Sequence, residues 1–481
     1  MPISNSNINI KTVRSDHENI TKPHILVFPY PAQGHMLSLL DLTHQLALRN
    51  IFITILITPK NLQTISPLLS THPTNITTLI LPLPNHPSIP QGIENVKDLP
   101  ISAFKNMMVA LGGLYDPVFK WFCNHSNPPV AIISDFFLGW THRLACELGI
   151  RRYTFSPSGA FAISVIYSLW KYERKRVNLE DDNEVIKFSK IPNSPEYPWW
   201  QVSVVYRSYE EGDEESEFIK EGFLGDIASW GLVINSFSEL ERVYFEYLKE
   251  ELGHDRVFAV GPLLPPEVKT SNRGGPTSGD VLSWLDTCGD TIVVYVCFGS
   301  QLVLNNEQME VVAVGLEKSG VRFVWSVKEP TVGHVASDYG RVPVGFEERV
   351  AGRGVVVRGW APQVAILSHD SVGAFLTHCG WNSIMEAVSA EVLMLTWPMS
   401  ADQFSNATLL QELKVGIKVC EGANTVPDSD ELAELFRKSV SQETRLERER
   451  AKELGKAAKE AVGERGSSVC ELHRLVENLK H

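Results

Sequence analysis

A histidine, small residues and polar side chains follow a short apolar stretch in the second half of the chain. The stretch is residues 372–377, VGAFLT, and residues 378–383 read HCGWNS. Apolar residues then recur at the spacing of a helix that faces a core, at Ile384, Met385, Ala387 and Val388. This order predicts a strand, a glycine turn and a helix. The free N–H groups and positive dipole end of such a helix favour a phosphate group as ligand.

Ser383 and Glu386 could instead form a capping box, which would suit any buried helix without a ligand. The surrounding residues favour a ligand site. Trp360 and Gln363 precede the stretch on a Gly-Trp-Ala-Pro turn, and residues 402–403, Asp-Gln, follow a second apolar stretch. All of them fall in loops at predicted strand ends, where ligand groups gather in open α/β sheets.

His35 is a candidate general base in the first half of the chain. It stands in the loop after the first predicted strand, residues 24–28, and an imidazole titrates near neutral pH. A lone loop histidine is more often incidental. Asp135 ends another apolar stretch, residues 131–135, and so points out at the carboxyl edge of the sheet, where it could also cap the following helix.

Residues 360–403 closely resemble the signature of plant secondary product glycosyltransferases, the donor-binding segment of the family 1 UDP-dependent glycosyltransferases. W-A-P-Q, H-C-G-W-N-S, a glutamate, a proline and D-Q all stand at the expected places. The strongest resemblance is to the group that acts on flavonols and hydroxybenzoates. It implies an α/β fold of the GT-B type, in which two facing Rossmann-like, doubly wound domains enclose a cleft and the second domain binds most of the nucleotide sugar.

The resemblance also implies a catalytic pair. The Gln-Gly-His at the end of the first strand takes the place of the family's catalytic histidine, so that His35 would remove a proton from the acceptor hydroxyl. Asp135 would orient His35 and stabilise the imidazolium that forms.

The positions implied for the donor fall into three groups. The uridine would be bound by Trp360, which stacks on uracil, by the backbone of Ala361, and by Gln363 and Glu386 at the ribose. The diphosphate would be bound by Ser300, His378, Asn382 and Ser383. The sugar hydroxyls would be bound by Asp402, Gln403 and the backbone of Trp381. Trp360 and Trp381 could alternatively be core aromatics. No metal is expected, because a helix N-terminus and a histidine meet the diphosphate.

The apolar stretches alternate with segments long enough to hold helices, which predicts doubly wound α/β domains. Residues 263–279 are rich in Pro and Gly and have linker composition. We therefore expect a flexible tail at 1–22, an acceptor-binding domain at 23–262, this linker, a UDP-sugar-binding domain at 280–464, and a helix at 465–481 that the resemblance brings back to the first domain.

Other local features leave alternatives open. Trp199 and Trp200 could pack on the first domain or help to wall an apolar acceptor pocket. Ser38 occupies a position where the family commonly has proline. The change removes a residue that favours the start of a helix and so bears on the position of His35. Residues 391–393, Glu-Val-Leu, replace the usual Gly-Val-Pro and put the conformation of that loop in question.

The composition narrows the class of protein. A net charge of −13 argues against a general nucleic-acid or anionic-membrane binder. The seven cysteines form no CxxC pair, which favours a reducing compartment. The first residues of the chain are polar and lack the apolar core of a signal peptide. No apolar run reaches the ~18 residues of a membrane span. We expect a cytoplasmic monomer without stable membrane insertion.

The expected activity is inverting transfer of a sugar from a UDP-sugar co-substrate, without any other cofactor, to a hydroxyl of a small plant phenolic or flavonoid. UDP-glucose is the first choice because Gln at position 403 accompanies glucose in the family, and UDP-xylose and UDP-rhamnose are alternatives. A non-catalytic nucleotide-binding protein or an NAD-dependent oxidoreductase is the alternative from another class, but no G-x-G-x-x-G follows a strand.

Overall fold

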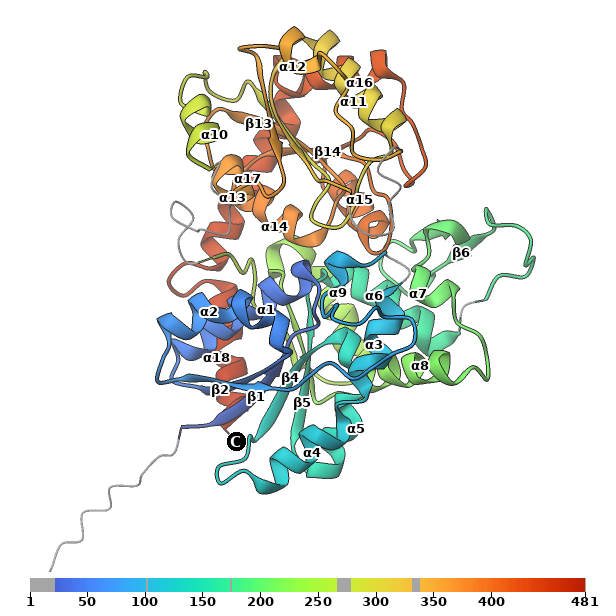
Figure 1. The fold of residues 1–481 in the computed structure, drawn as a ribbon, viewed down its shortest axis with the longest axis vertical. Coiled ribbons are helices and arrows are strands. Elements are labelled where there is room, and N and C mark those ends of the chain that lie inside the picture. The colour runs from blue at the N-terminus through green and yellow to red at the C-terminus, as the bar shows by residue number, and fades with distance from the viewer. Residues whose placement is uncertain (1–21, 101–102, 174, 266–277, 331–337, 481) are drawn as a thin grey trace, which may run out of the picture.

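The chain is seen in a computed structural model, which describes residues 22–100, 103–173, 175–265, 278–330 and 338–480. Two parallel sheets form its two lobes, one from each half of the chain (Figure 1). Their strands are runs of apolar, largely β-branched residues, which is typical of strands covered by helices on both faces. The predicted α/β architecture of two doubly wound domains is therefore confirmed.

The first sheet has seven strands in the order β3-β2-β1-β4-β5-β8-β9. The order reverses direction at β1 and β4, whose carboxyl ends carry the loops with His35 and Asp135. The bounds are β1 His24–Phe28, β2 Phe52–Ile57, β3 Ile76–Ile80, β4 Ala131–Asp135, β5 Arg151–Ser156, β8 Gly231–Ile234 and β9 Val257–Ala259.

The second sheet has six strands in the order β12-β11-β10-β13-β14-β15. Its bounds are β10 Val293–Cys297, β11 Arg322–Val327, β12 Gly354–Arg358, β13 Val372–Thr377, β14 Leu393–Thr396 and β15 Gly416–Lys418. A separate antiparallel pair, β6 Val185–Lys187 and β7 Glu196–Pro198, projects from the first lobe (Figure 1).

Helices cover both faces of each sheet. In the first half they are α1 Gln33–Ala47, α2 Leu62–Thr71, α3 Phe104–Gly112, α4 Tyr115–Asn124, α5 Thr141–Leu148, α6 Ala160–Tyr172, α7 Val204–Arg207, α8 Glu214–Ile227 and α9 Ser238–Leu252. In the second half they are α10 Ser278–Leu285, α11 Asn306–Ser319, α12 Phe346–Arg349, α13 Gln363–Leu367, α14 Trp381–Ser389, α15 Gln403–Glu412, α16 Ser429–Ser439, α17 Arg445–Ala461 and α18 Ser467–Lys480.

The last helix, α18, lies in the lobe of the first sheet rather than beside the second (Figure 1). Its apolar face, which includes Leu472 and Leu475, belongs to the same buried cluster as β1 and β2. Arg151 of β5 also donates a hydrogen bond to the carbonyl of Asn478 (2.9 Å). Of the predicted linker, residues 266–277 lie outside the described part of the chain, and the domain limits stay a prediction.

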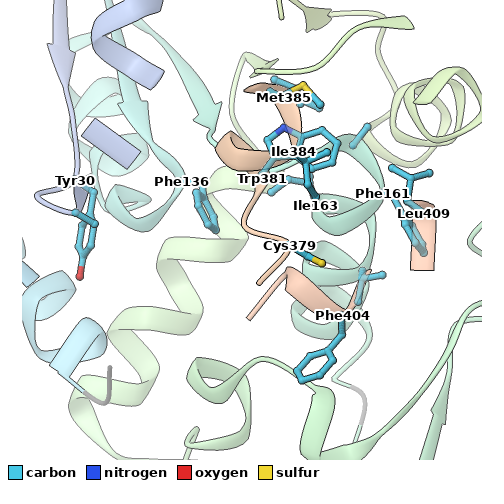
Figure 2. Packing of buried hydrophobic residues seen from close by; sticks show 14 of the residues in the cluster. Tyr30, Phe136, Phe161, Ile163, Cys379, Trp381, Ile384, Met385, Phe404 and Leu409 are labelled. Carbon is cyan, nitrogen blue, oxygen red and sulfur yellow. The ribbon is translucent and has the colours of Figure 1, made fainter. Parts of the chain in front are cut away.

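A buried cluster continues from one domain into the other. Figure 2 shows part of it, including Phe161 and Ile163 of α6 and Trp381 and Ile384 of α14. The burial of these residues removes apolar surface of both domains from water at one junction. The domains therefore meet through a packed contact beside the site described below.

The two departures from the family pattern are accommodated locally. Ser38 lies inside α1, and its hydroxyl donates to the carbonyl oxygen of Gly34 (3.0 Å). Glu391 adopts a φ of +63° where the family has glycine. This left-handed conformation is unusual for a residue with a Cβ, and an ion pair with Lys459 (2.6 Å) holds the side chain.

Candidate active site

His35 and Asp135 are in direct contact, although 99 residues lie between them in the chain. His35 Nδ1 lies 2.9 Å from Asp135 Oδ2. The carboxylate is fully buried, whereas 18% of the His35 side chain is exposed. Because β1 and β4 are adjacent parallel strands, their carboxyl ends bring the two residues together at one edge of the sheet.

Asp135 also performs the capping role considered as the alternative. Its other oxygen, Oδ1, accepts a hydrogen bond from the backbone N–H of Phe137 (2.9 Å). The rings of Phe136 and Phe137 stack on His35, with centroids 5.5 Å and 4.9 Å from the imidazole. The imidazole is therefore fixed on one side by a carboxylate and on its face by aromatic rings, which leaves Nε2 as the nitrogen for a substrate.

Two cavities lie in the cleft between the domains, and they meet at Gly34, Ser300 and His378. The first, of about 230 Å³, is walled mainly by residues of the first domain, many of them apolar, and contains His35. The second, of about 440 Å³, lies at the carboxyl edge of the second sheet. It contains the residues predicted for uridine and diphosphate, namely Ser300, Trp360, Ala361, Gln363, His378, Asn382, Ser383 and Glu386, together with Trp381, whose backbone is predicted for the sugar.

Helix α14 opens at the second cavity without a side-chain cap. Gly380 is its N-cap residue, and the helix starts at Trp381, so Ser383 lies in the first turn. The capping-box alternative is therefore wrong, because Ser383 sits too far inside the helix to be the N-cap residue. The free N–H groups of this first turn can bind an anion.

His378 is neutral at physiological pH, because withdrawal of its ring from water lowers its pKa to about 4. Its Nδ1 has no hydrogen-bond partner among the described residues. The ring also occupies the space beside Gly299, where a Cβ would lie 2.6 Å from His378 Cε1. A neutral imidazole with an unsatisfied nitrogen beside a helix N-terminus is suited to donate to a phosphate oxygen.

The uridine residues form one hydrogen-bonded group. Gln363 Nε2 donates to Glu386 Oε2 (2.7 Å) and to the hydroxyl of Ser383 (2.8 Å). Trp360 follows β12 and is 38% exposed, while Ala361 is buried. Because so much of the Trp360 side chain stays accessible at a cavity wall, the ring can stack on a base. The core-aromatic alternative does not fit Trp360.

The side chain of Trp381, in contrast, is a core aromatic. The indole is buried and donates from Nε1 to the carbonyl of Asn235 in the first domain (2.6 Å). It also fills the space against Gly159, where a Cβ would lie 2.5 Å from the ring. Asn382 makes a second link between the domains, from Nδ2 to the carbonyl of Gly34 (2.6 Å), and its Oδ1 has no described partner.

Asp402 and Gln403 border the first cavity rather than the second. Asp402 Oδ2 accepts hydrogen bonds from the hydroxyl of Ser158 (2.7 Å) and from Asn406 (3.1 Å). Burial raises the pKa of Asp402, although these bonds and the nearby His35 oppose the shift. The Gln403 carbonyl oxygen accepts from the backbone N–H groups of residues 399 and 400 (3.0 Å each), which fixes the side chain.

The chain is similar to known proteins over most of its length. Residues 268–441 match the family model described as UDP-glucoronosyl and UDP-glucosyl transferase. The chain is 77% identical to UDP-glycosyltransferase 89B2 of Stevia rebaudiana, over 95% of this chain and 97% of that protein. The chain belongs to the UDP-glycosyltransferase family. It is an enzyme whose donor co-substrate is a UDP-sugar, so the dehydrogenase and non-catalytic alternatives are wrong.

Two further members of the UDP-glycosyltransferase family are also similar over nearly their whole length. Flavonol 3-O-glucosyltransferase UGT89B1 of Arabidopsis thaliana is 56% identical, over 97% of this chain and 98% of that protein. The crystal structure of A. thaliana UGT89C1 with UDP-L-rhamnose is 38% identical and superimposes with a TM-score of 0.80, covering 96% of this chain and all of the other. UGT89C1 has also been solved with quercetin. The predicted GT-B fold is confirmed.

Several residues of the site in this UDP-glycosyltransferase were missed by sequence reasoning. Ser158 and Asn235 contact Asp402 and Trp381 across the cleft, and Phe136 and Phe137 stack on His35. The phenylalanines directly follow Asp135, and that adjacency could have indicated them. Ser158 and Asn235 carry no local signal, because their partners lie in the other domain.

Trp199 and Trp200 were expected either to pack on the first domain or to wall an apolar acceptor pocket, and the structure does not place them in the wall of the first cavity. Neither indole is among the residues that wall the first cavity, whereas Tyr197, Gln201 and Val202 around them are. Trp200 instead packs edge-on against Phe404 of the second domain (centroids 5.3 Å apart).

Within the described residues, no cluster of three or more His, Cys, Asp or Glu side chains could hold a metal ion. In the same part of the chain, no helix combines the length and apolar character needed to cross a membrane.

Proposed function

We propose that this enzyme transfers glucose from UDP-glucose to a hydroxyl of a small phenolic or flavonoid acceptor, with inversion at the anomeric carbon. The observation that carries the proposal is the His35–Asp135 pair at the boundary of an apolar cavity and a nucleotide-type cavity. An acceptor in the first cavity would present its hydroxyl to His35 Nε2. A sugar at the junction would present its anomeric carbon to that hydroxyl.

The reaction would proceed as a single displacement. His35 takes the proton as the acceptor oxygen forms its bond to the anomeric carbon, and the bond to the UDP oxygen breaks on the opposite face. The buried Asp135 carboxylate stabilises the imidazolium that results, because opposite charges 2.9 Å apart interact strongly away from water. An α-linked donor would give a β-glycoside.

The leaving diphosphate gains negative charge as that bond breaks. The first turn of α14, the neutral His378 and the hydroxyls of Ser300 and Ser383 border the cavity where this charge would develop. Fixed donors of this kind stabilise a transition state without reorganising. Trp360 and Ala361 would bind uracil, and Gln363 with Glu386 would bind the ribose.

The acceptor class is supported by the walls of the first cavity. They include Phe104, Phe136, Phe137 and Phe223, and aromatic rings pack well against a planar phenolic molecule. The names of the relatives agree, since UGT89B1 is called a flavonol 3-O-glucosyltransferase and UGT89C1 has been solved with quercetin.

The donor sugar depends on Asp402, Gln403 and the backbone of Trp381. A fixed carboxylate and amide can bind adjacent equatorial hydroxyls of glucose. UDP-xylose shares these ring hydroxyls and is the nearest competitor, because a missing hydroxymethyl group changes binding by only ~1–3 kcal/mol. UDP-rhamnose is a second competitor, since the related UGT89C1 has been solved with UDP-L-rhamnose.

A competition assay tests the proposal. Equal concentrations of UDP-glucose, UDP-xylose, UDP-galactose and UDP-rhamnose are offered with a panel of phenolics and flavonols, and products are identified by mass. We expect β-glucosides to dominate, and Gln403→Ala to lower kcat/KM for UDP-glucose by at least ~10-fold, because an amide fixed in place is lost. Preference for rhamnose or galactose, or an unchanged Gln403→Ala enzyme, would contradict the assignment of the sugar.

A further inference from the structure

Lys328 borders the nucleotide-type cavity but has no role in the site described so far. It is the first residue after β11, and Trp360 and Ser300 follow the neighbouring strands β12 and β10. Because these strands are parallel, the loops after them lie in the same order along one edge of the sheet. Lys328 therefore lies between the residue proposed for uracil and a residue proposed for the diphosphate.

The ammonium group of Lys328 has no polar partner within the part of the chain that the structure describes. No described residue accepts a hydrogen bond from it or forms an ion pair with it within 4 Å. Burial lowers its pKa to about 8, with Lys97 adding to the shift and Asp98 opposing it. A half-buried cation without a partner is unfavourable unless a ligand supplies the missing anion.

The walls of the cavity provide few anionic groups for the Lys328 ammonium. Its lining includes the carboxylates of Glu329 and Glu386, of which Glu386 already accepts from Gln363. Uracil is neutral and would offer only carbonyl oxygens, whereas a phosphate offers negative charge and several acceptors. Along the sheet edge, the anion nearest to the nucleoside is the first phosphate.

We propose that Lys328 is a donor-binding residue whose ammonium binds the α-phosphate of the UDP-sugar. This inference depends on the donor site proposed above. Lys328 would act as a point charge on the nucleotide and not on the sugar or the acceptor, so it contributes to affinity for every UDP-sugar alike.

The test compares how UDP, UMP and uridine inhibit the wild-type enzyme and the Lys328→Met variant. A charge-assisted hydrogen bond contributes about 1.5–3 kcal/mol, so we expect the inhibition constants of UDP and UMP to rise at least ~10-fold. Uridine, which has no phosphate, should inhibit both proteins equally. Lys328→Arg should restore most of the affinity, because it keeps the charge.

Lys97→Met is the matched control, because it removes a neighbouring cation that lies outside the cavity. It should leave UDP inhibition unchanged. A thermal unfolding midpoint close to that of the wild type would show that Lys328→Met is folded. An unchanged constant for UDP, or an equal loss for uridine, would overturn the assignment.

The pH dependence gives an independent readout. The pKa of Lys328 is about 8, so the side chain loses its positive charge as pH rises above about 8. The affinity of the wild-type enzyme for UDP should therefore fall above that pH, and Lys328→Met should lack this decline. The charged groups around the amine are Asp98 and Lys97 of the first domain and the adjacent Glu329, and the Lys97→Met control separates the contribution of Lys97. Absence of the decline in the wild-type enzyme would contradict the proposal.

Trp360→Ala distinguishes failure of this inference from failure of the donor site. If Trp360→Ala weakens both uridine and UDP while Lys328→Met changes neither, only the role of Lys328 is wrong. If Trp360→Ala changes nothing, the donor site itself is wrong.

Discussion

At the scale of single residues, the proposed chemistry depends on how Asp135 uses its two oxygens. Oδ2 contacts the imidazole of His35, and Oδ1 accepts from the backbone of Phe137. The second contact fixes the carboxylate, so that it can hold His35 with Nε2 directed away from it. Asp135 can thus cap the following turn and hold His35 at the same time.

His35→Ala should lower kcat by at least ~10², because general-base assistance contributes about 10²–10⁴. Inhibition by UDP should stay within about 2-fold, since His35 is not among the residues of the nucleotide-type cavity. Asp135→Asn should show a similar loss. Steady-state kinetics with UDP inhibition measures both quantities.

His86→Ala is a suitable control, because His86 lies in the same domain and pairs with Glu215 away from the cavities. It should keep normal turnover. Normal turnover in His35→Ala as well would remove His35 from the mechanism.

At the scale of elements, β4 and β5 are tied to α8 by a fully buried ion pair. Arg152 of β5 contacts Asp226 of α8 (2.5 Å), and its Nε donates to the hydroxyl of Ser134, the residue before Asp135. Burial raises the pKa of Asp226, and the guanidinium of Arg152 opposes that shift. The pair therefore fixes the strand end that carries Asp135, the carboxylate proposed to act with His35.

Asp226→Ala should lower the free energy of unfolding by about 3–5 kcal/mol, because it leaves the Arg152 charge buried without a partner. Glu434→Ala is the control, since its partner Arg437 is exposed, and it should cost at most about 1 kcal/mol. Chemical denaturation of the two variants provides the comparison. Equal, small losses would show that the buried pair does not hold these elements together.

At the scale of the whole molecule, residues proposed to bind the donor also make contacts between the two domains. Ser158 of the first domain donates to Asp402 of the second, while Trp381 and Asn382 bond to carbonyls of the first domain. Each link lies beside a residue proposed to bind the donor. The contact between the domains therefore uses residues that are also proposed to bind the donor.

Ser158→Ala should raise KM for UDP-glucose by about 5–10-fold, because the buried Asp402 loses one of its two side-chain hydrogen-bond donors. UDP carries no sugar, so its inhibition constant should hardly change. Ser164→Ala is the control, since this hydroxyl donates within α6, to the carbonyl of Ala160 (2.7 Å). Equal shifts for UDP and UDP-glucose would mean that Ser158 acts on the nucleotide or on the domains as a whole.

The sequence alone determined the elements that carry the site. The predicted strands at residues 24–28, 131–135 and 372–377 coincide with β1, β4 and β13. Strands buried on both faces need uninterrupted apolar residues, which gives them a strong local signal. The 360–403 segment likewise predicted many of the residues that line the second cavity, because these residues lie close together in the chain.

Only the tertiary structure decided which residues meet across the cleft. The start of α14 at Trp381, the buried position of its indole, and the contacts of Ser158 and Asn235 could not be read from local pattern. Ser158 and Asp402 are 244 positions apart, and the residues around each of them do not indicate that the two are in contact. Their pairing follows from the packing of two separately folded sheets against each other, which depends on the shapes of both surfaces rather than on any single stretch of chain.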